Sequence, residues 1–447
     1  MEKLPQSFVD RIKHQFPDDA MELISALDDA PKTSIHLHPL KSNHIDLSGV
    51  KVPWFDRGFI LTERPSFTLD PLFHAGCYYP QESSSMFLNH VLSSIWKEKK
   101  NIVALDLCAA PGGKSLILSS FFGNDGLVIS NEVNKTRNSI LCENLQKWSA
   151  INTLVSQTSS EKWSTAGIDF DLVLVDAPCS GEGMFRKDHE SRNEWNEHAA
   201  AACGRRQTDI LNDVAPIIRE GGILIYSTCT FAVEENEQQC RALMESGQWE
   251  SVSIGIDPSW NIRIIEENGY QAYQFLPHRI PGEGFFISVF RKKSNTSTRN
   301  KQRPVRVFRA IDRQEKEILK SWVDGDCHLT VAPDQSIYAS SVDADTLNSW
   351  ASGIYFTMPG IEVGRLVRNE LIPAHALALS PLRNPSLHEE ELNEDEALQF
   401  LRGESIQPFS NAGWVVVKYK THPLGWVKSL SNRVNNYYPK EYRIKMR

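Results

Sequence analysis

The feature that most constrains the fold of this chain is a regular alternation of short apolar runs with helical patterns between residues 102 and 246. The runs are rich in Val, Ile and Leu, which is typical of strands buried on both faces. The alternation predicts an α/β fold with a mostly parallel sheet covered by helices. Strands are expected at Ile102–Leu107, Leu127–Asn131, Thr153–Val155, Asp171–Val175 and Ile223–Ser227, and helices at Ser115–Phe122, Lys135–Trp148, Arg205–Arg219 and Glu234–Ser246.

Weaker patterns on either side of this core indicate further domains. Residues 3 to about 30 carry apolar side chains at helical spacing. Lys292–Arg303 is basic and rich in Ser, Thr and Asn, which is typical of a linker. With 447 residues the chain is long enough for two or three domains. We expect a small N-terminal α+β region at 1–100, the α/β core at 101–293, a basic linker at 294–310 and a second α+β region at 311–447.

The composition is that of a soluble globular protein, with 41% hydrophobic and 23% charged residues. No apolar run reaches the length of a membrane span, and the first residues do not resemble a secretory signal. We therefore expect a cytoplasmic protein with no membrane partner.

The distribution of charge indicates that basic segments, and not the protein as a whole, would attract nucleic acid. The formal net charge is −8. However, eight Lys or Arg and no acid lie between Arg291 and Arg309, and eight more accompany a single acid between Trp414 and Arg447. Part of the acid excess lies in Glu389–Glu396, which we interpret as a solvated helix face. Basic segments can bind phosphate on an acidic protein, although solvated surface explains them equally well.

The eight cysteines predict neither a metal site nor a disulfide framework. No CxxC pair occurs, and disulfides are rare in large cytosolic proteins. Cys142 and Cys240 lie within helical patterns and are interpreted as structural, while Cys203 and Cys327 have no evident role. Two other cysteines, at positions 179 and 229, each follow an apolar run and lie among polar or glycine residues.

A glycine turn at the end of the first strand indicates a cofactor site. Ligands of open α/β sheets bind at the carboxyl ends of the strands, and the small residues of Cys108-Ala-Ala-Pro-Gly-Gly-Lys permit close approach to the backbone. A Walker A loop is disfavoured because its first glycine would be residue 108, and a GxGxxG motif is absent. A purely structural glycine turn is the alternative. Glu132, at the end of the next strand, favours a nucleoside-containing cofactor because a carboxylate there can accept both ribose hydroxyls.

Asp176, Cys179 and Cys229 supply the residue types that methylation of cytosine carbon 5 requires. This carbon accepts a methyl group from S-adenosylmethionine only after a thiolate has added to carbon 6. An acid at N3 assists the addition, and a base then removes the carbon-5 proton so that the thiol can leave. The residue types alone leave open which cysteine attacks. Arg186 and Lys187 follow Cys179 and are candidates to stabilise a thiolate.

At these residues the chain resembles the Nop/Sun family of RNA 5-methylcytosine methyltransferases, and within it the bacterial RsmF-type branch that modifies 16S ribosomal RNA. The resemblance extends over nearly the full length, and it implies a Rossmann-like, seven-stranded methyltransferase core that uses S-adenosylmethionine. The paired Pro-Cys and Thr-Cys motifs are highly specific. The matching segments are Tyr78-Tyr-Pro-Gln-Glu-Ser-Ser-Ser-Met, Ala109-Ala-Pro-Gly-Gly-Lys, Asp176-Ala-Pro-Cys-Ser-Gly-Glu-Gly-Met-Phe-Arg-Lys-Asp, Ser227-Thr-Cys-Thr, Glu234-Glu-Asn-Glu, Leu276-Pro-His, Gly282-Glu-Gly-Phe-Phe and His422-Pro-Leu-Gly-Trp-Val-Lys.

The resemblance also implies roles for individual residues. Cys229, of the Thr-Cys motif, is expected to be the nucleophile, and Cys179, of the Pro-Cys motif, to assist elimination and product release. Asp176 is expected at the floor of the site. The implied cofactor contacts are Cys108, Ala109, Ala110, Pro111, Gly112, Gly113, Lys114, Glu132 and Asp176.

Two positions depart from the family pattern. After the third strand, where relatives carry an acid or another polar contact, this chain has Val155-Ser-Gln-Thr-Ser, and Gln157 is a weak candidate for that contact. Near the start, His36 and His38 stand where related sequences tend to carry Arg and Asn. We interpret both histidines as facing solvent.

The resemblance further implies RNA-binding modules at both ends of the chain, with a PUA-like fold near the C-terminus. Aromatic and basic residues alternate there, as on RNA-binding surfaces, although aromatics at strand spacing are more often core. The expected partner is 16S ribosomal RNA and not DNA, bound by a monomer with the target base flipped or unpaired. A tRNA substrate and a non-catalytic RNA-binding assembly factor are the alternatives. The candidates for RNA contact are Lys187, Arg186, Lys418, Lys428 and Arg433.

Overall fold

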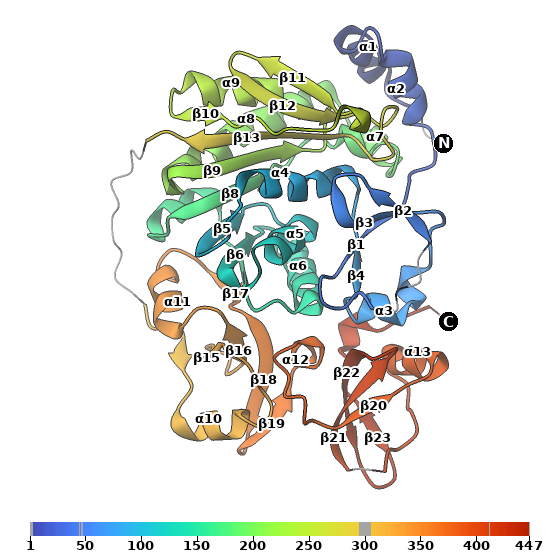
Figure 1. Cartoon of the computed structure of the whole chain (residues 1–447), viewed down its shortest axis with the longest axis vertical. Helices are drawn as coiled ribbons and strands as arrows, with labels where there is room; N and C mark the ends of the chain where they lie inside the picture. The colour runs from blue at the N-terminus through green and yellow to red at the C-terminus, as the bar shows by residue number, and fades with distance from the viewer. Residues whose placement is uncertain (1–2, 44, 46–47, 295–304, 411, 447) are drawn as a thin grey trace.

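A computed structural model describes residues 3–446, apart from 44, 46–47, 295–304 and 411. Most of the linker expected at 294–310 lies outside these described residues. Within them, the strands form an N-terminal sheet, a large central sheet and two C-terminal sheets. The N-terminal and central sheets make up the upper part of the molecule in Figure 1, and the two C-terminal sheets lie below them.

The N-terminal part is a helical pair followed by a small antiparallel sheet. Two helices confirm the helical periodicity of the first 30 residues, and they bury Phe8, Ile12 and Leu23 against Phe185 and Trp195 of the central part. The sheet has the order β2-β3-β1-β4. The elements are α1 (Gln6–Gln15), α2 (Ala20–Ala26), β1 (Ser34–Leu37), β2 (Gly49–Val52), β3 (Phe55–Leu61), α3 (Pro71–His74), β4 (Tyr78–Pro80) and α4 (Phe87–Ile95).

His36 and His38 do not face solvent, so that interpretation is wrong. Their exposed fractions are 0% and 5%. The His36 ring lies 4.9 Å from the rings of both Phe55 and Trp148. The His38 Nδ1 accepts the backbone amide of Lys41, so its Nε2 carries the proton and donates to the Trp148 carbonyl at 3.0 Å. Burial lowers the pKa of His36 to about 3 and that of His38 to about 2, and both rings are neutral packing elements.

The central sheet confirms the α/β fold class. Its order is β11-β12-β13-β9-β8-β5-β6-β7-β17, and β10 pairs with β13. The path from β7 to β12 contains the seven strands expected of the core, and β10, β11 and β17 extend it. The strands are β5 (Ile102–Asp106), β6 (Gly126–Asn131), β7 (Thr153–Ser156), β8 (Phe170–Asp176), β9 (Ile218–Thr228), β10 (Trp249–Ser251), β11 (Arg263–Glu267), β12 (Tyr270–Phe275), β13 (Phe285–Lys292) and β17 (Phe356–Met358).

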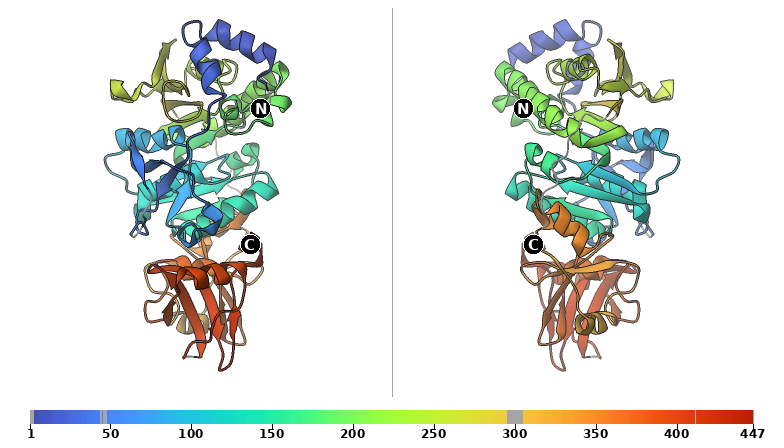
Figure 2. Two further views of the ribbon diagram at one scale, coloured as in Figure 1. Left: turned by 90° about the vertical axis from the view of Figure 1, so that its right-hand side faces the viewer. Right: turned by 90° about the vertical axis from the view of Figure 1, so that its left-hand side faces the viewer.

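Helices cover both faces of this sheet, as the side views also show (Figure 2). Leu172 and Leu174 of β8 face α4 and most of α5, whereas Val173 and Val175 face the side of α8 and α9. This alternation explains why the central strands read as continuous apolar runs. The helices are α5 (Gly113–Phe122), α6 (Lys135–Trp148), α7 (Ser191–Glu194), α8 (Glu197–Val214) and α9 (Glu237–Glu245).

The expected bounds of α8 were wrong, because the helix begins and ends earlier than residues 205–219. The Asn196 side chain accepts the amide of Ala199 and caps its start. Pro216 lacks the amide hydrogen and prevents the helix from continuing. A single 3-10 turn, Ala215–Ile217, then leads into β9, which begins at Ile218.

The C-terminal part consists of two small sheets and sends one strand into the central sheet. β17 pairs antiparallel with β7. The expected domain boundary at residue 311 stays a prediction, and β17 is a strand from beyond that boundary that belongs to the central sheet. The two sheets have the orders β14-β15-β16-β18-β19 and β20-β21-β22-β23. Their elements and helices are β14 (Arg309–Ala310), α10 (Arg313–Leu319), β15 (His328–Val331), β16 (Ile337–Ser340), α11 (Ala344–Trp350), β18 (Ile361–Val367), β19 (Glu370–Pro373), α12 (His375–Leu379), β20 (Glu389–Glu391), α13 (Glu394–Arg402), β21 (Gly413–Tyr419), β22 (His422–Ser429) and β23 (Val434–Asn436).

The acidic run Glu389–Glu396 is not one helix face, so that expectation is corrected. Its first three residues form β20, which pairs parallel with β21. Asn393 then caps α13, and the carboxylates of its first turn favour the positive end of the helix dipole. The capping box at Asn393 therefore marks the boundary between strand and helix.

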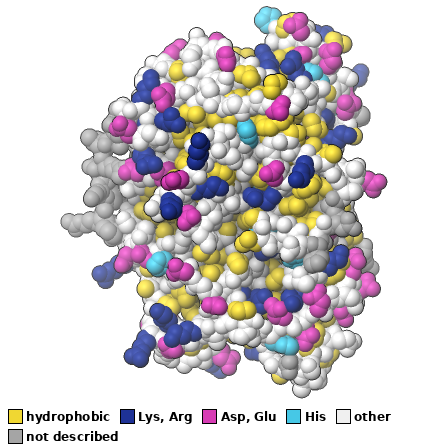
Figure 3. Space-filling model, viewed as in Figure 1, with side chains coloured by type: hydrophobic (Ala, Val, Ile, Leu, Met, Phe, Trp, Pro, Cys, Tyr) yellow, Lys and Arg dark blue, Asp and Glu magenta, His cyan; other side chains and the backbone are white. Residues whose placement is uncertain are grey.

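The surface carries charges of both signs. On the face seen in Figure 3, Lys and Arg side chains lie among Asp and Glu side chains and form no continuous basic area among the described residues. Within the same residues, no helix is long and apolar enough to cross a membrane.

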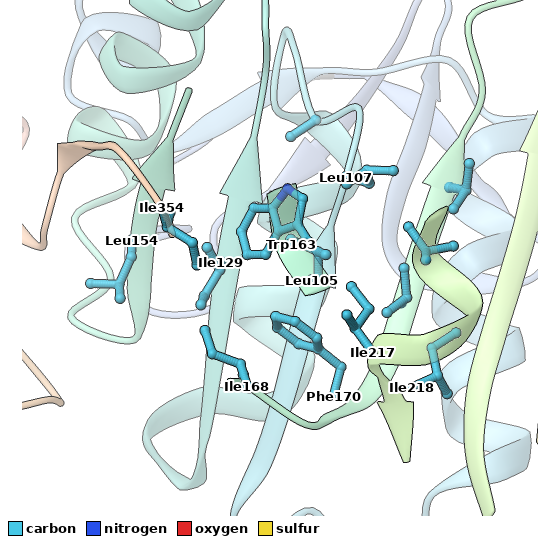
Figure 4. Packing of buried hydrophobic residues seen from close by; sticks show 14 of the residues in the cluster. Leu105, Leu107, Ile129, Leu154, Trp163, Ile168, Phe170, Ile217, Ile218 and Ile354 are labelled. Atoms are coloured by element: carbon cyan, nitrogen blue, oxygen red, sulfur yellow. The ribbon is translucent and has the colours of Figure 1, made fainter. Parts of the chain in front are cut away.

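A buried cluster joins the central sheet to the C-terminal part (Figure 4). The fully buried Trp163 packs edge-to-face on Phe170, with their ring centroids 5.8 Å apart. Ile354, which precedes β17, lies in the same cluster beside Leu154 of β7. Burial of apolar surface on both sides of β7 therefore holds β17 in place.

Candidate active site

The segment from Cys108 to Lys114 leads from β5 into the first turn of α5, and side chains of the neighbouring helix α6 donate hydrogen bonds to it. Arg137 donates to the Ala110 carbonyl at 2.7 Å, and Asn144 donates to the Pro111 carbonyl at 2.8 Å. Gly112 has φ +121°, which an L residue rarely adopts, so the turn into α5 requires glycine. The loop places the backbone of Cys108, Ala109, Ala110, Pro111, Gly112, Gly113 and Lys114 at the carboxyl end of β5.

Glu132 lies directly after β6 at the same edge of the sheet, where it is 3% exposed. One carboxylate oxygen accepts the amide of Asn134 at 2.8 Å, and the other is 3.3 Å from Arg137. Gln157, the candidate after β7, donates from its side chain to the Val133 carbonyl at 3.0 Å. The structure thus places Gln157 beside the turn that carries Glu132.

Asn131 ties the ends of three strands together. Its side-chain amide donates to the carbonyls of Leu107 and Thr158, and its oxygen accepts from Thr158 and Ser156. Ala109 in turn donates its amide to the Asn131 carbonyl at 2.8 Å. These bonds fix the carboxyl ends of β5, β6 and β7 relative to one another.

Asp106 is a buried carboxyl group that sequence reasoning missed. It ends β5 and is 0% exposed. Its Oδ2 accepts the Ser115 hydroxyl at 2.7 Å, while its Oδ1 has no hydrogen-bond partner among the described residues. Burial raises the pKa of Asp106 to about 7, and the carboxylates of Asp176 and Glu132 add to this effect. A charged residue within an apolar run was the sequence signal for this position.

The two predicted cysteines meet at the ends of β8 and β9. Their Sγ atoms are 3.1 Å apart, and the Cys229 amide is 3.4 Å from the Cys179 Sγ. The hydrogen bond between the thiols, together with burial, raises the pKa of Cys179. The raised pKa favours the protonated form of Cys179, and either sulfur of the pair can serve as the donor to the other.

Asp176, the last residue of β8, lies between a cation and a hydroxyl. Lys114 Nζ is 2.9 Å from its Oδ2, and the Ser227 hydroxyl donates to its Oδ1 at 2.8 Å. Burial lowers the pKa of Lys114, but the carboxylates of Asp176 and Asp106 outweigh this effect and raise it. Lys114 is thus a fixed ammonium group, which joins the cofactor loop to the strand end of Asp176.

The structure corrects the expectation for Arg186. The residue is 4% exposed, its Nε donates to Glu283 at 2.9 Å and its Nη2 to the Gly282 carbonyl at 2.6 Å. An arginine bound in this way is not available for RNA or for a thiolate. Glu283 lies in a distant segment of the chain, which is why sequence reasoning missed the pair. Lys187 is exposed and remains a candidate.

The C-terminal candidates differ in availability. Lys418 is 2.7 Å from Glu389, so its charge is already paired. Lys428 lies over the Trp414 ring at 5.3 Å from the centroid, and Tyr437, which is 38% exposed, packs on the same indole. Arg433 is exposed on the turn between β22 and β23. Lys428 and Arg433 are therefore the better candidates for RNA contact.

Two further polar side chains near the cysteines escaped sequence reasoning. Glu235 and Gln207 are 0% exposed, and both bond to the loop that carries Cys179. Glu235 lies in the Glu234-Glu-Asn-Glu motif, which carried no role by itself, and Gln207 lies on an ordinary helix. No group of three or more His, Cys, Asp or Glu that could hold a metal occurs among the described residues.

The doubly covered sheet, the glycine turn and the carboxylates at the strand ends define a methyltransferase of the α/β type. Among solved structures, the methyltransferase homolog protein from Pyrococcus horikoshii is 26% identical and covers 64% of this chain and 95% of its own, with a TM-score of 0.56.

Family comparisons are consistent along the chain. The model of the N-terminal domain of 16S rRNA methyltransferase RsmF matches residues 4–83, that of 16S rRNA methyltransferase RsmB/F matches 94–291, and that of the methyltransferase RsmF PUA domain matches 388–444. Ribosomal RNA small subunit methyltransferase F of Aliivibrio fischeri is 26% identical over 98% of this chain and 97% of its own length. The same enzyme of Erwinia tasmaniensis is 27% identical, over 98% and 96%. The chain is an RNA methyltransferase that is similar, over most of its length, to 16S rRNA methyltransferases of the RsmB/F type.

The raised pKa of Asp106 predicts a measurable dependence of stability on pH. An Asp in the unfolded chain titrates near pH 4, so between about pH 4 and 7 only the folded state retains this proton. The stability that Asp106 contributes is therefore present below pH 4 and is lost as the pH rises through 7.

Asp106→Asn removes this titration. Relative to the wild-type protein, the variant is expected to become more stable by about 2 to 3 kcal/mol as the pH rises from 5 to 8. Melting temperatures of both proteins across this range measure the difference. Parallel pH profiles of the two proteins would contradict the assignment.

Proposed function

We propose that this protein methylates carbon 5 of a cytosine in 16S ribosomal RNA, with S-adenosylmethionine as the methyl donor. The observation that carries the proposal is the 3.1 Å contact between the sulfur atoms of Cys179 and Cys229, beside Asp176 and Lys114. Two thiols and a carboxyl group next to a cofactor loop fit the addition and elimination chemistry of a pyrimidine.

Cys229 is the nucleophile in this proposal. The thiol gives its proton to solvent, the freed electron pair on sulfur forms a bond to carbon 6, and the electrons of the C5–C6 double bond become available at carbon 5. Because the raised pKa of Cys179 favours its protonated form, we assign the attack to Cys229 and to Cys179 a hydrogen bond toward the attacking sulfur. The geometry therefore agrees with the assignment that the family resemblance implies.

Asp176 holds the proton at N3 of the cytosine during the addition. Its carboxyl group is oriented by Lys114 and by Ser227, so it faces the base in one fixed direction. The ammonium of Lys114, whose pKa is raised by the surrounding carboxylates, also balances negative charge that develops in the ring and on sulfur.

Elimination reverses the first step. The proton on carbon 5 passes to solvent, its bonding electrons restore the C5–C6 double bond, and the C6–S bond breaks with its electron pair returning to Cys229. Cys179 donates a hydrogen bond to the departing sulfur and so stabilises it as a leaving group. The two cysteines thus act in different steps, Cys229 in the addition and Cys179 in the elimination.

The residues at the edge of the sheet fit S-adenosylmethionine, which supplies an electrophilic methyl group when bound. Glu132 offers a carboxylate at the position where a ribose is held in related α/β folds. The buried Asp106 Oδ1 and Ser130 Oγ have no hydrogen-bond partners among the described residues. The glycine turn admits a ligand close to the backbone.

The choice of 16S ribosomal RNA rests on the family comparisons, whose models and full-length relatives carry that substrate in their names. The match to a PUA domain supports RNA contact by the C-terminal part. Bisulfite sequencing of RNA incubated with the enzyme tests the proposal as a whole. It is expected to show a new 5-methylcytosine in 16S ribosomal RNA, and modification of tRNA alone would contradict the substrate.

The cysteine assignment predicts opposite outcomes for two substitutions. Cys229→Ala is expected to abolish methyl transfer, because the nucleophile is lost. Cys179→Ala is expected to accumulate a denaturation-resistant protein–RNA adduct, because elimination is slowed. Gel electrophoresis with labelled RNA detects the adduct. Cys203→Ala is the control, since this partly exposed cysteine has no assigned role and the variant should stay active without an adduct. Full activity of Cys229→Ala would overturn the assignment.

The cofactor assignment predicts that Glu132→Ala weakens binding of S-adenosylmethionine by about 10- to 100-fold, which is the effect of losing hydrogen bonds to a charged acceptor. Isothermal titration calorimetry measures the affinity without RNA. Glu161→Ala, at an exposed carboxylate, is the control and should bind normally. Unchanged affinity of Glu132→Ala would remove Glu132 from the site.

RNA contact by the C-terminal part is tested with point substitutions, because a deletion from residue 311 would also remove β17 from the central sheet. Lys428→Ala and Arg433→Ala are each expected to weaken RNA binding and to reduce the salt dependence by about one ion per phosphate contact. Lys320→Ala, at the C-cap of α10 and paired with Glu317, is the control. Equal salt dependence in all of these proteins would place the contact elsewhere.

A further inference from the structure

The loop that carries Cys179 is held on both sides of the cysteine by two buried side chains. On one side, Gln207 Nε2 donates to the Pro178 carbonyl at 2.9 Å. On the other, Glu235 Oε2 accepts the Ser180 amide at 2.9 Å, and its Oε1 accepts the Ser180 hydroxyl. The backbone groups immediately before and after Cys179 are thus fixed from outside the loop.

The two side chains also bond to each other and to the strand that leads to Cys229. Gln207 Nε2 lies 3.0 Å from Glu235 Oε2. The Tyr226 hydroxyl, on β9, lies 3.0 Å from Gln207 Oε1 and 2.6 Å from the Glu235 carbonyl. Cys229 follows Tyr226 by three residues, so β9 carries one cysteine and also contacts the side chains that hold the loop of the other. We call Gln207 and Glu235 the loop bracket.

A third bond joins the two cysteine loops directly. The hydroxyls of Ser180 and Thr230 lie 2.9 Å apart, each next in sequence to one of the cysteines. The hydroxyl of Ser180 therefore connects the bracket to the residue after Cys229. Together these bonds form a closed network around the contact between the sulfur atoms.

Burying the carboxylate of Glu235 costs solvation free energy, which argues that this side chain has a specific role. Glu235 is 0% exposed, and among the described residues no Lys or Arg forms an ion pair with it. Burying a carboxylate without a cation is unfavourable unless several donors satisfy it. Here its acceptors are used by Ser180 and Gln207, which are the groups that position the loop.

We propose that Glu235 and Gln207 are positioning residues for the release step, because they hold the thiol of Cys179 within hydrogen-bond distance of the sulfur of Cys229. The proposal rests on the proposed function, in which Cys179 assists elimination. Cys229 follows directly from β9, and main-chain pairing of that strand with β8 and β13 holds it even when the bracket is lost. Loss of the bracket should therefore slow elimination and leave the attack on carbon 6 intact.

The test compares two rates in Glu235→Ala and Gln207→Ala. Single-turnover methyl transfer to RNA reports on attack, and the lifetime of the denaturation-resistant adduct reports on release. We expect transfer within about 3-fold of the wild-type rate and an adduct lifetime lengthened about 10-fold or more, in the direction of Cys179→Ala. Glu235→Gln, which retains one acceptor for Ser180, is expected to restore release in part.

Glu237→Ala is the matched control. Glu237 is a second buried carboxylate two residues further along, and its Oε2 has no hydrogen-bond partner among the described residues. It should release RNA at the wild-type rate. Should Glu235→Ala fail to fold, Gln207→Ala carries the test, because it leaves the carboxylate and its bonds to Ser180 in place and removes the bonds of Gln207 to Pro178, Tyr226 and Glu235.

The controls separate failure of this inference from failure of the proposed function. If Cys179→Ala forms no adduct, the proposed function is wrong and the bracket has no release step to serve. If Cys179→Ala forms the adduct but both bracket variants release RNA at the wild-type rate, only the inference is overturned. Equal loss of transfer and release in folded bracket variants would also overturn it, since that pattern indicates a general structural role.

Discussion

The parallel pairing of β5, β6, β8 and β9 is the constraint on which the rest of the structure depends. Parallel strands that share a direction end at one edge, so residues separated by more than a hundred positions in the chain meet there. Cys108 and Cys229 are brought to the same edge in this way, and Asn131 fixes the strand ends against one another. The strands are buried on both faces, which keeps the edge rigid.

Several carboxyl groups lie close together at this edge of the sheet. The carboxyl groups of Asp106 and Asp176 lie near the ammonium of Lys114, and Glu132 is paired with Arg137. Burial and repulsion from Asp176 and Glu132 raise the pKa of Asp106, and the carboxyl groups of Asp176 and Asp106 raise the pKa of Lys114. A site with these properties favours cationic ligands and keeps its lysine charged, which fits a cofactor with a positive sulfur centre and a chemistry that develops negative charge.

Sequence reasoning predicted the parts that depend on local pattern. The βαβ alternation gave the strands and most helices, and the position of each reactive residue after an apolar run placed it at the sheet edge. It failed where partners are distant in the chain. Glu283 buries Arg186, Trp148 buries His36, and Glu235 reaches Ser180 across 55 positions, contacts that no local pattern encodes. The strand–helix boundary in the acidic run depended on pairing with β21, which composition does not reveal.

The edge strand β17 restricts how far the C-terminal part can move relative to the central sheet. The amide of Gln157 donates to the Tyr355 carbonyl at 2.8 Å, so main-chain bonds connect the C-terminal part to the strand end beside Glu132. A flexible tether would let the C-terminal part sample many separations from this strand end. An edge strand held by main-chain pairing instead keeps residues 356–358 at one separation from the carboxyl end of β7.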